Sequence, residues 1–455
     1  MNNKNLLTYN AKVNSVGQVY YSPVAVLPPP LSTVIGTTYC FLAHIDPWED
    51  DNDPPQPQQD QSYLKSVFKS IFVAKKVTIN DLSPVIERIN WESGITYDYY
   101  QDSVDMFAVD LEGKLVKRFY VKNKFDQVFK CLWNNNGSPS TFEPFFQPGN
   151  YGTNNIYTGV DGYKWKYMYT IDIGLKQKFM DMKWIPIPEG ASIPNTLSTT
   201  AGSGDIEVIN VTDSGSGYDP ANSLITISIT GDGTGAVAVA EVIDGSIAEI
   251  VVTNAGSNYT FANVSIISSV GTGAIATAPI SPIGGHAFDP ISELGCSHIM
   301  FTSEFNGSEG GLIPVDIDYR QVGLLINPIA LSTAPKPADA PIYKTTTDFI
   351  VAPGFGQYVV DDTIYQGTSL AEATFSARIL SFDVETNVIR LINTVGTPVY
   401  NAPVFSTLTG TVRTLLSVSL PDLQPFSGYM IYIENRTGIQ RSSDGIEQFR
   451  FVLGY

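Results

Sequence analysis

The sequence predicts a mainly β protein with one or two helices in loops. Its composition is the first reason, because 38 Gly, 29 Pro, 24 Tyr and 23 Phe in 455 residues are typical of strands joined by many turns. The second reason is that residues 163–169 and 430–436 alternate with a period of two residues. The third is a glycine-rich unit that occurs twice in succession.

The charge content excludes several function classes. Charged residues make up only 16% of the chain, the net charge is −18, and no more than two Lys or Arg residues are adjacent. Nucleic-acid binding needs a basic stripe that neutralises phosphates, and an anionic membrane surface would repel this protein, so we predict neither partner. The N-terminal residues lack a signal-peptide pattern, and no run of about 18 apolar residues occurs, which predicts a soluble protein made in the cytoplasm. Three widely spaced cysteines suggest no disulfide framework.

The N-terminal region predicts two extended segments, an acidic loop and a helix. The extended segments cover residues 16–26 and 33–45 and flank three prolines, and the proline-rich loop DPWEDDNDPPQPQQDQ follows at 46–61. In residues 62–76, SYLKSVFKSIFVAKK, apolar side chains recur at i, i+3, i+4, i+7 and i+8, which predicts a helix packed on a sheet. Asp60 or Ser62 is available as its N-cap.

Strands are predicted next, at 106–113, 114–123 and 127–134. Residues 158–173, TGVDGYKWKYMYTIDI, alternate sharply, with Tyr163, Trp165, Tyr167 and Tyr169 on one face and lysines and Met168 on the other. Such an aromatic row is a sheet's packing face or a platform on which sugars stack, and packing is the commoner case.

Two further regions differ in character from the rest. Residues 206–242 and 247–280 are two copies of one unit rich in Val, Ile and Gly, which predicts a duplicated β unit. Its GDGTGAV segment is neither a dinucleotide-binding nor a Walker motif, so its glycines are predicted to serve turns. Residues 344–415 contain five or six short strands with turn signals between them, as expected of a small barrel or sandwich.

The C-terminal segment predicts two strands. Met430, Tyr432, Glu434 and Arg436 alternate with Ile431, Ile433 and Asn435, and a returning strand contains Phe449, Phe451 and Leu453. We expect Glu434-Asn435-Arg436 to end the first strand, at a loop or subunit contact or at an exposed hairpin end.

No residue pattern argues for catalysis, a cofactor or a metal. Three histidines are too few and too isolated for a catalytic dyad, and His286 is predicted to be a solvated or hydrogen-bonded loop residue. Residues 49–53 are acidic but lack the spacing of a calcium loop. Asp316 and Asp318 lie two apart on a predicted strand, where an ion-paired structural role is better supported than a glycosidase pair. We therefore predict that the protein is not an enzyme.

Seven motifs, in this order, resemble the baseplate wedge protein of T4-like contractile-tailed bacteriophages, the family of gene product eight. They are HIDPW (44–48) with the acidic loop, the helix with VIERINW (85–91), VFKCLW (128–133), DGYKWKYMYTI (161–171), WIPIP (184–188), YRQVGLLINP (319–328) and the C-terminal SGYMIYIENRTGI with its returning strand. The resemblance covers 1–200, 284–342 and 416–455 as one discontinuous wedge core. Residues 201–283 and 343–415 are the two insertions, more loosely similar to those in wedge proteins of cyanobacterial phages. VIERINW is less basic than its counterpart in the family.

The resemblance implies a layered β-sandwich that forms homodimers and binds the other wedge subunits, in the baseplate of a virion assembled in the host cytoplasm. It implies no small-molecule substrate. Candidate interface or fold-defining residues are Trp48, Trp91, Tyr163, Trp165, Arg320, Glu434, Asn435 and Arg436.

Two other readings remain open. The chain could be a receptor- or glycan-binding tail protein, with the repeat and the small barrel as binding modules. It could also be a polysaccharide hydrolase, although the carboxylate arrangement for that reaction is not evident in the sequence.

Overall fold

The computed structural model describes residues 4–7, 37–111, 114–147, 155–191, 204–334 and 336–454. The described chain is mainly β, which confirms the predicted fold class. Its α-helices, within these residues, are α3 (Gln61–Ser70), α4 (Ile173–Phe179) and α5 (Pro290–Glu293). The chain divides into two compact units: Met1–Leu82 with Phe301–Leu453 form unit 1, and Ser83–Met300 form unit 2. The predicted extended segment at 16–26 lies outside the described residues.

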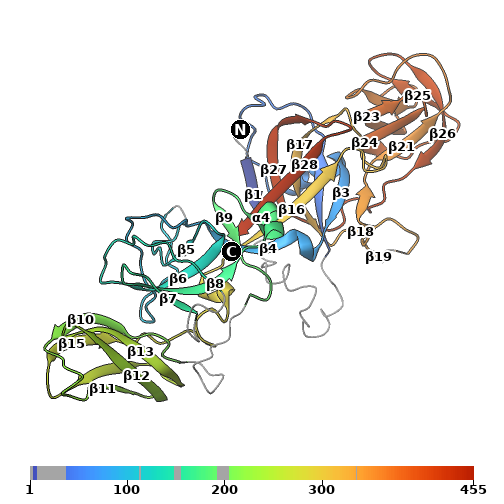
Figure 1. Cartoon of the computed structure of the whole chain (residues 1–455). Helices are drawn as coiled ribbons and strands as arrows, with labels where there is room; N and C mark the ends of the chain where they lie inside the picture. The colour runs from blue at the N-terminus through green and yellow to red at the C-terminus, as the bar shows by residue number, and fades with distance from the viewer. Residues whose placement is uncertain are drawn as a thin grey trace. The chain divides into compact units, whose positions relative to one another are not determined.

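Unit 1 is built on a six-stranded antiparallel sheet whose strands come from distant parts of the chain (Figure 1). In order across the sheet, its strands are β1 (Lys4–Leu7), β27 (Tyr429–Gln440), β17 (Asp318–Ile326), β2 (Thr38–Ala43), β3 (Ile71–Val77) and β20 (Ile342–Lys344). Every residue of β2 is buried, as expected of a central strand covered on both faces.

Two layers cover this sheet. On one face lies a sheet in which β16 (His298–Asn306) neighbours β28 (Ile446–Gly454), and aromatic rings fill the space between. Tyr319 packs on Phe449 and Tyr432 on Phe451, with ring centroids 5.9 and 5.3 Å apart. On the other face, Val67 of α3 joins a buried cluster with residues of β2, β3 and β27. The result is a β-sandwich with a helix on its outer side.

The predicted helix is half correct. Helix α3 begins after Asp60, whose side chain accepts a hydrogen bond from the Tyr63 amide, as one of the two proposed N-caps. It ends at Ser70, however, and Ile71–Val77 is strand β3. The helical spacing of apolar residues continues across this boundary. The helix nevertheless ends there because the residues that follow, several of them β-branched, pair with β2 and β20, and that pairing overrides the local helical pattern.

The second insertion forms a closed barrel within unit 1, the first of the two forms expected for it (Figure 1). Around the barrel, the strands are β21 (Thr347–Val351), β24 (Val388–Gly396), β23 (Phe375–Asp383), β22 (Thr363–Gln366), β25 (Pro403–Ser406) and β26 (Val412–Ser419). Inward-facing Phe349, Ile379 and Leu391 are completely buried, so the barrel has a packed core of its own.

Unit 2 contains a four-stranded sheet and a strand pair. The sheet order is β5 (Tyr120–Lys122), β6 (Gln127–Asn134), β8 (Tyr163–Thr170) and β7 (Ile156–Thr158), and the pair is β4 (Leu82–Glu87) with β9 (Trp184–Pro186). The strand predicted at 127–134 is confirmed. Those predicted at 106–113 and 114–123 are mostly wrong: the described part of this region holds only β5 and two isolated bridges, Val109–Leu115 and Asn90–Lys122.

Both faces of β8 are buried, not only its aromatic face. Tyr163 and Trp165 are 0% exposed and pack in one cluster, but Lys166 on the opposite face is only 1% exposed. The alternation also breaks, since Met168 and Tyr169 both join a second cluster. The reason is that the pairing of β8 with β6 shifts register at Met168, and this bulge turns the side chains on either side of it to different faces.

The duplicated unit folds as two interlocked copies. One copy supplies β10 (Asn210–Ser216), β11 (Thr226–Gly231) and β12 (Thr234–Ile243), and the other supplies β13 (Ser246–Ser257), β14 (Ala262–Ile267) and β15 (Thr272–Thr277). Strand β10 pairs with β15, β11 with β14 and β12 with β13, so every strand has its partner in the other copy.

Matching contacts repeat in the two copies. The Tyr218 hydroxyl accepts a hydrogen bond from the Ala274 amide at 3.2 Å, and the Tyr259 hydroxyl accepts one from the Ala236 amide at 3.4 Å. Of the GDGTGAV glycines, Gly233 lies in the turn between β11 and β12, as predicted, whereas Gly231 ends β11 and Gly235 lies within β12.

Candidate functional site

The acidic loop after β2 is held in place by residues of two distant strands, β17 and β27. Its Trp48 indole donates a hydrogen bond to the Arg436 carbonyl at 2.8 Å. Arg320 of β17 binds both carboxylate oxygens of Asp51, at 3.1 and 2.9 Å, and Asn435 of β27 donates to the Pro55 carbonyl at 2.8 Å. We call this set, Trp48, Asp51, Arg320, Asn435 and Arg436, the acidic-loop anchor.

Arg320 is the centre of the anchor. Its guanidinium also pairs with Asp318, so it is shared between the loop and the sheet, and the predicted ion-paired role of Asp318 is confirmed. Asp316, in contrast, precedes the strand in a left-handed conformation, with φ of 60°. Hydrogen bonding to Arg320 lowers the pKa of Asp51, and that of Arg320 is raised in return. The arrangement stays charged at every physiological pH.

Asn435 fixes the anchor to helix α3. Its side-chain oxygen accepts hydrogen bonds from the Tyr63 hydroxyl at 3.1 Å and from the Gln321 amide at 2.9 Å, and Asn435 is completely buried. A side-chain amide can accept hydrogen bonds from Tyr63 and Gln321 and also donate one to Pro55. Neither a carboxylate nor an apolar side chain could make all three bonds.

The prediction that Glu434-Asn435-Arg436 ends a strand is wrong, and so is the alternative of an exposed hairpin end. Strand β27 continues to Gln440, and Glu434 is only 5% exposed. Glu434 binds the Arg436 guanidinium at 2.9 Å and accepts from the Tyr432 hydroxyl at 3.0 Å, while Arg436 lies over the Phe449 ring. Glu434 and Arg436 thus satisfy each other along one strand face, and only the Phe449 ring comes from a different strand.

His44 links the same loop to the barrel. Its Nε2 lies 2.6 Å from Asp361 Oδ1 and its Nδ1 2.8 Å from Asp318 Oδ1, and the ring is 1% exposed. Arg378 binds Asp361 at 2.6 Å and Asp46 at 2.9 Å. Burial alone would lower the pKa of His44, but the hydrogen bonds to Asp318 and Asp361 outweigh it and raise that pKa.

The anchored loop presents a fixed acidic surface. Pro54 and Pro57 are buried, while Asp46, Glu49 and Asp50 are exposed. Two prolines, a bidentate ion pair and an indole hydrogen bond restrict the backbone, so little conformational entropy is lost if a partner binds this surface. In the described part of the chain, no group of three or more His, Cys, Asp or Glu residues could hold a metal ion.

The remaining predicted residues lie in unit 2 and serve packing. Tyr163 stacks on Trp165 with centroids 5.5 Å apart, and Tyr97 meets Trp165 edge-on at 5.6 Å. The partly buried Trp91 donates to the Ser140 hydroxyl at 3.0 Å. Since Tyr163 and Trp165 are fully buried, neither is available as a stacking platform for sugars.

Unit 2 also holds a buried charge cluster that the sequence did not reveal. Lys130 binds Glu293 at 2.9 Å and His286 Nδ1 at 3.1 Å, and Lys166 binds Glu207 at 3.0 Å, all almost fully buried. Burial lowers the pKa of Lys130, although Glu293 opposes this effect, and burial together with Lys130 lowers that of His286. His286 is therefore hydrogen-bonded, the second of the two environments predicted for it, and not solvated. A lysine on a strand gives no signal of which carboxylate, if any, it meets.

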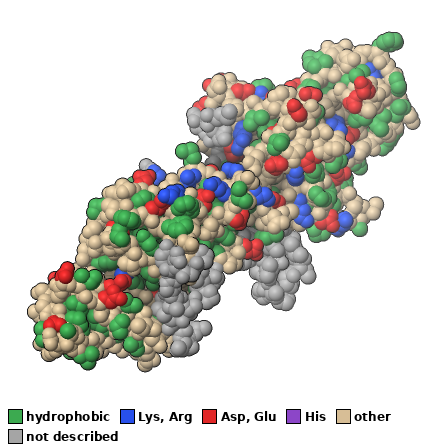
Figure 2. All heavy atoms as spheres, viewed as in Figure 1, with side chains coloured by type: hydrophobic (Ala, Val, Ile, Leu, Met, Phe, Trp, Pro, Cys, Tyr) green, Lys and Arg blue, Asp and Glu red, His purple; other side chains and the backbone are tan. Residues whose placement is uncertain are grey.

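The face of the molecule in Figure 2 shows acidic and basic side chains dispersed among more numerous uncharged and hydrophobic ones, as the composition leads one to expect. No helix in the described residues has both the length and the apolar character needed to cross a membrane. No protein-family model matches the chain, and no curated protein sequence matches it.

Proposed function

We propose that this protein is a structural subunit of a contractile-tail baseplate wedge, which joins neighbouring wedge proteins during assembly and host-triggered rearrangement. The observation that carries the proposal is the ordered series of seven motifs. Two of them, HIDPW and the C-terminal motif, are far apart in sequence, yet they supply Trp48, Asn435 and Arg436 to one anchor. The two motifs therefore contribute to the same local structure, the acidic-loop anchor.

The surfaces of the two inserted regions support a role in binding other proteins. In the barrel, Phe355 is 100% exposed and Leu408 73% exposed. In the duplicated unit, Val237, Val239 and Val251 are all exposed, and Val239 pairs with Val251 across adjacent strands. Exposed apolar groups of this kind are typical of protein–protein contacts.

The experiment is to localise the protein in particles. An antibody raised against the purified chain, tested by immunogold electron microscopy on contractile-tailed virions of the source, should label the tail end distal to the capsid. Antibody preadsorbed with the chain is the control. Label along the sheath, on the fibres alone, or on no particle would refute the proposal.

Two further measurements separate the competing functions. Light scattering of the purified chain should give the mass of a dimer, and a strict monomer at high concentration would contradict the expected homodimer. Selective binding on a glycan array, or cleavage of host polysaccharide, would favour an adhesin or a hydrolase instead.

A further inference from the structure

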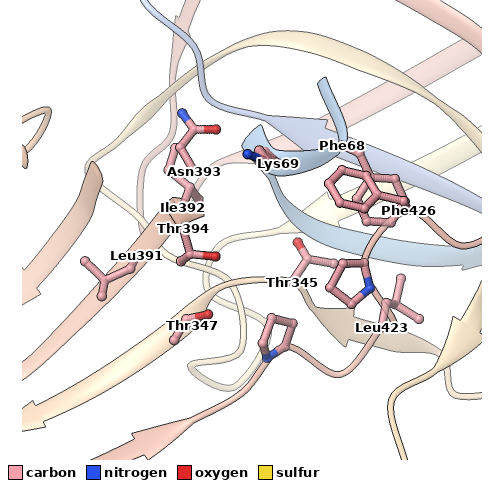
Figure 3. Close-up of a pocket in the computed structure, with 12 residues that line it drawn as sticks. Phe68, Lys69, Thr345, Thr347, Leu391, Ile392, Asn393, Thr394, Leu423 and Phe426 are labelled. Atoms are coloured by element: carbon pink, nitrogen blue, oxygen red, sulfur yellow. The ribbon is translucent and has the colours of Figure 1, made fainter. Parts of the chain in front are cut away.

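A groove lies in unit 1 where the end of helix α3 meets the barrel (Figure 3). It encloses a cavity of about 250 Å³. Its wall is made by the last turn of α3, barrel strand β24 and the segment that leaves the barrel, and includes Phe68, Lys69, Leu391, Asn393 and Phe426. None of these residues belongs to the acidic-loop anchor.

The groove lies just beyond the end of the pairing between β21 and β24. Strands β21 and β24 pair up to Thr347–Leu391, but before Thr347 the chain turns away, and the Thr345 hydroxyl donates to the Ile71 carbonyl at 2.7 Å. Residues of β24 beyond Leu391 therefore pair with β23 on one side and border the groove on the other. Asn393 is left-handed, with φ of 53°, and its side chain accepts from the Ser70 hydroxyl at 3.2 Å, which fixes this edge to α3.

One wall of the groove is formed by two aromatic rings, and the backbone of one of these residues is strained. The rings of Phe68 and Phe426 lie 5.5 Å apart, and Phe426 is 48% exposed. Phe426 also has a φ of 60°, a conformation that costs about 1–3 kcal/mol for a bulky residue and that concentrates at functional sites. This conformation keeps a half-exposed ring at the mouth of the groove.

The other wall is polar and carries a single charge. Lys69 is the one charged residue among those lining the groove, in a protein of net charge −18. In Figure 3 its ammonium and the Asn393 side chain lie on the same side of the cavity, away from the two rings. A positive group beside an amide donor, across from two rings, is complementary to a carboxylate attached to an apolar group.

We propose that this groove binds a short peptide segment of a partner protein, in which an apolar side chain is followed by an acidic residue. The apolar side chain lies between Phe68, Phe426 and Leu391, and the carboxylate meets Lys69. The cavity is smaller than the roughly 300–1,000 Å³ of typical small-molecule sites, which suits one or two side chains of a peptide lying along β24. The proposal does not depend on the baseplate role.

The test is a fluorescence-polarisation screen of the intact chain against capped octapeptides, in pairs that contain Leu-Asp or Leu-Asn at the same position and are otherwise identical. The Asp peptides should bind at least about tenfold more tightly than their Asn partners, because a hydrogen bond to a charged group is lost. Lys69→Gln should abolish this preference. Lys65→Gln, which removes an exposed lysine one turn earlier on α3, is the matched control and should leave it unchanged.

A second variant protects the test against misfolding. Phe426→Gly relieves the left-handed strain, so it should fold normally, yet it removes one ring of the groove and should weaken binding by about tenfold or more. Equal affinity for Asp and Asn peptides, or equal losses in the two lysine variants, would overturn the proposal. So would binding of phenylacetate without any peptide, or a self-association of the chain that Phe426→Gly removes.

Discussion

His44 provides the sharpest quantitative prediction, because one buried ring joins the barrel to the sandwich. The perturbation is His44→Gln, which keeps a hydrogen-bonding side chain but removes the charge. The groups that face His44 are Asp318 of β17 and Asp361 of the barrel, and the nearby charges are Asp46, Asp51, Arg320 and Arg378.

The magnitude follows from the two hydrogen bonds. A hydrogen bond to a charged group contributes about 1.5–3 kcal/mol, but the contact to Asp361 must be discounted because that carboxylate is 47% exposed. We expect His44→Gln to lower the free energy of unfolding of unit 1 by about 2–3 kcal/mol at mildly acidic pH.

The pH dependence has a definite sign. The folded-state pKa of His44 is above its ordinary 6.5, so its stabilisation is complete below that value and is lost as pH rises through the folded pKa. The slope in that window is about −1.4 kcal/mol per pH unit. The pKa values of Asp318 and Asp361 are lowered from 3.8, so both stay charged there, and their own contributions disappear only as pH falls through those lowered values.

The assay is urea unfolding with 5-fluorotryptophan and ¹⁹F NMR, between about pH 5 and 8.5. Trp48 is the one tryptophan of unit 1, so its resonance, assigned with Trp48→Phe, reports that unit alone. The free energy of unfolding of the wild type should exceed that of His44→Gln most at low pH, and this difference should shrink as pH rises. His298→Gln, in unit 2, is the control. A difference that is flat, or that grows with pH, would refute the argument.

Three other experiments, each based on one main substitution, test the rest of the fold. Gly256→Ala should unfold the duplicated unit, since the φ of Gly256 is 64° and a Cβ there would stand 2.6 Å from the Ala236 nitrogen. Gly235→Ala is the control: the φ of Gly235 is 86°, but the nearest atom to its Cβ would be 3.7 Å away, so the change should cost only about 1 kcal/mol of stability. Equal shifts of the melting temperature in the two variants would contradict this prediction. Lys130→Met should lower the free energy of unfolding of unit 2, measured in urea, by about 3–5 kcal/mol, because it leaves Glu293 buried without its cation. Adding Glu293→Gln should recover part of this loss. No recovery would show that the two residues are not coupled. Arg320→Lys loses the two-pronged contact to Asp51 and should speed cleavage by the Glu-specific protease after Glu49, whereas an unchanged rate would mean that the anchor does not hold the loop.

Local patterns predicted those elements that carry most of their apolar residues within one short segment. Strand β6 and the closing strand β28 were predictable because each has enough apolar and β-branched residues within its own length. The repeat was visible because two copies carry the same glycine and tyrosine positions.

The same patterns failed where a distant strand decided the outcome. Ile71–Val77 continues a helical stripe but pairs with β2 and β20, and the register shifts of β8 and β27 turned residues away from the faces that strict alternation assigned. Trp48, Arg320, Asn435 and Arg436 were singled out by sequence, but nothing in their neighbourhoods indicated that they would meet. Lys130 and Lys166 carried no signal of burial at all.

The sequence by itself determined the class of structure, mainly β, and the duplicated unit, because composition, periodicity and internal repetition are properties of short segments. Only the tertiary structure decided how these segments pair, which polar side chains are buried, and that the acidic loop is held by β17, β27 and the barrel. The physical reason is that a buried charge is stable only beside its partner, and the partners here lie hundreds of residues away.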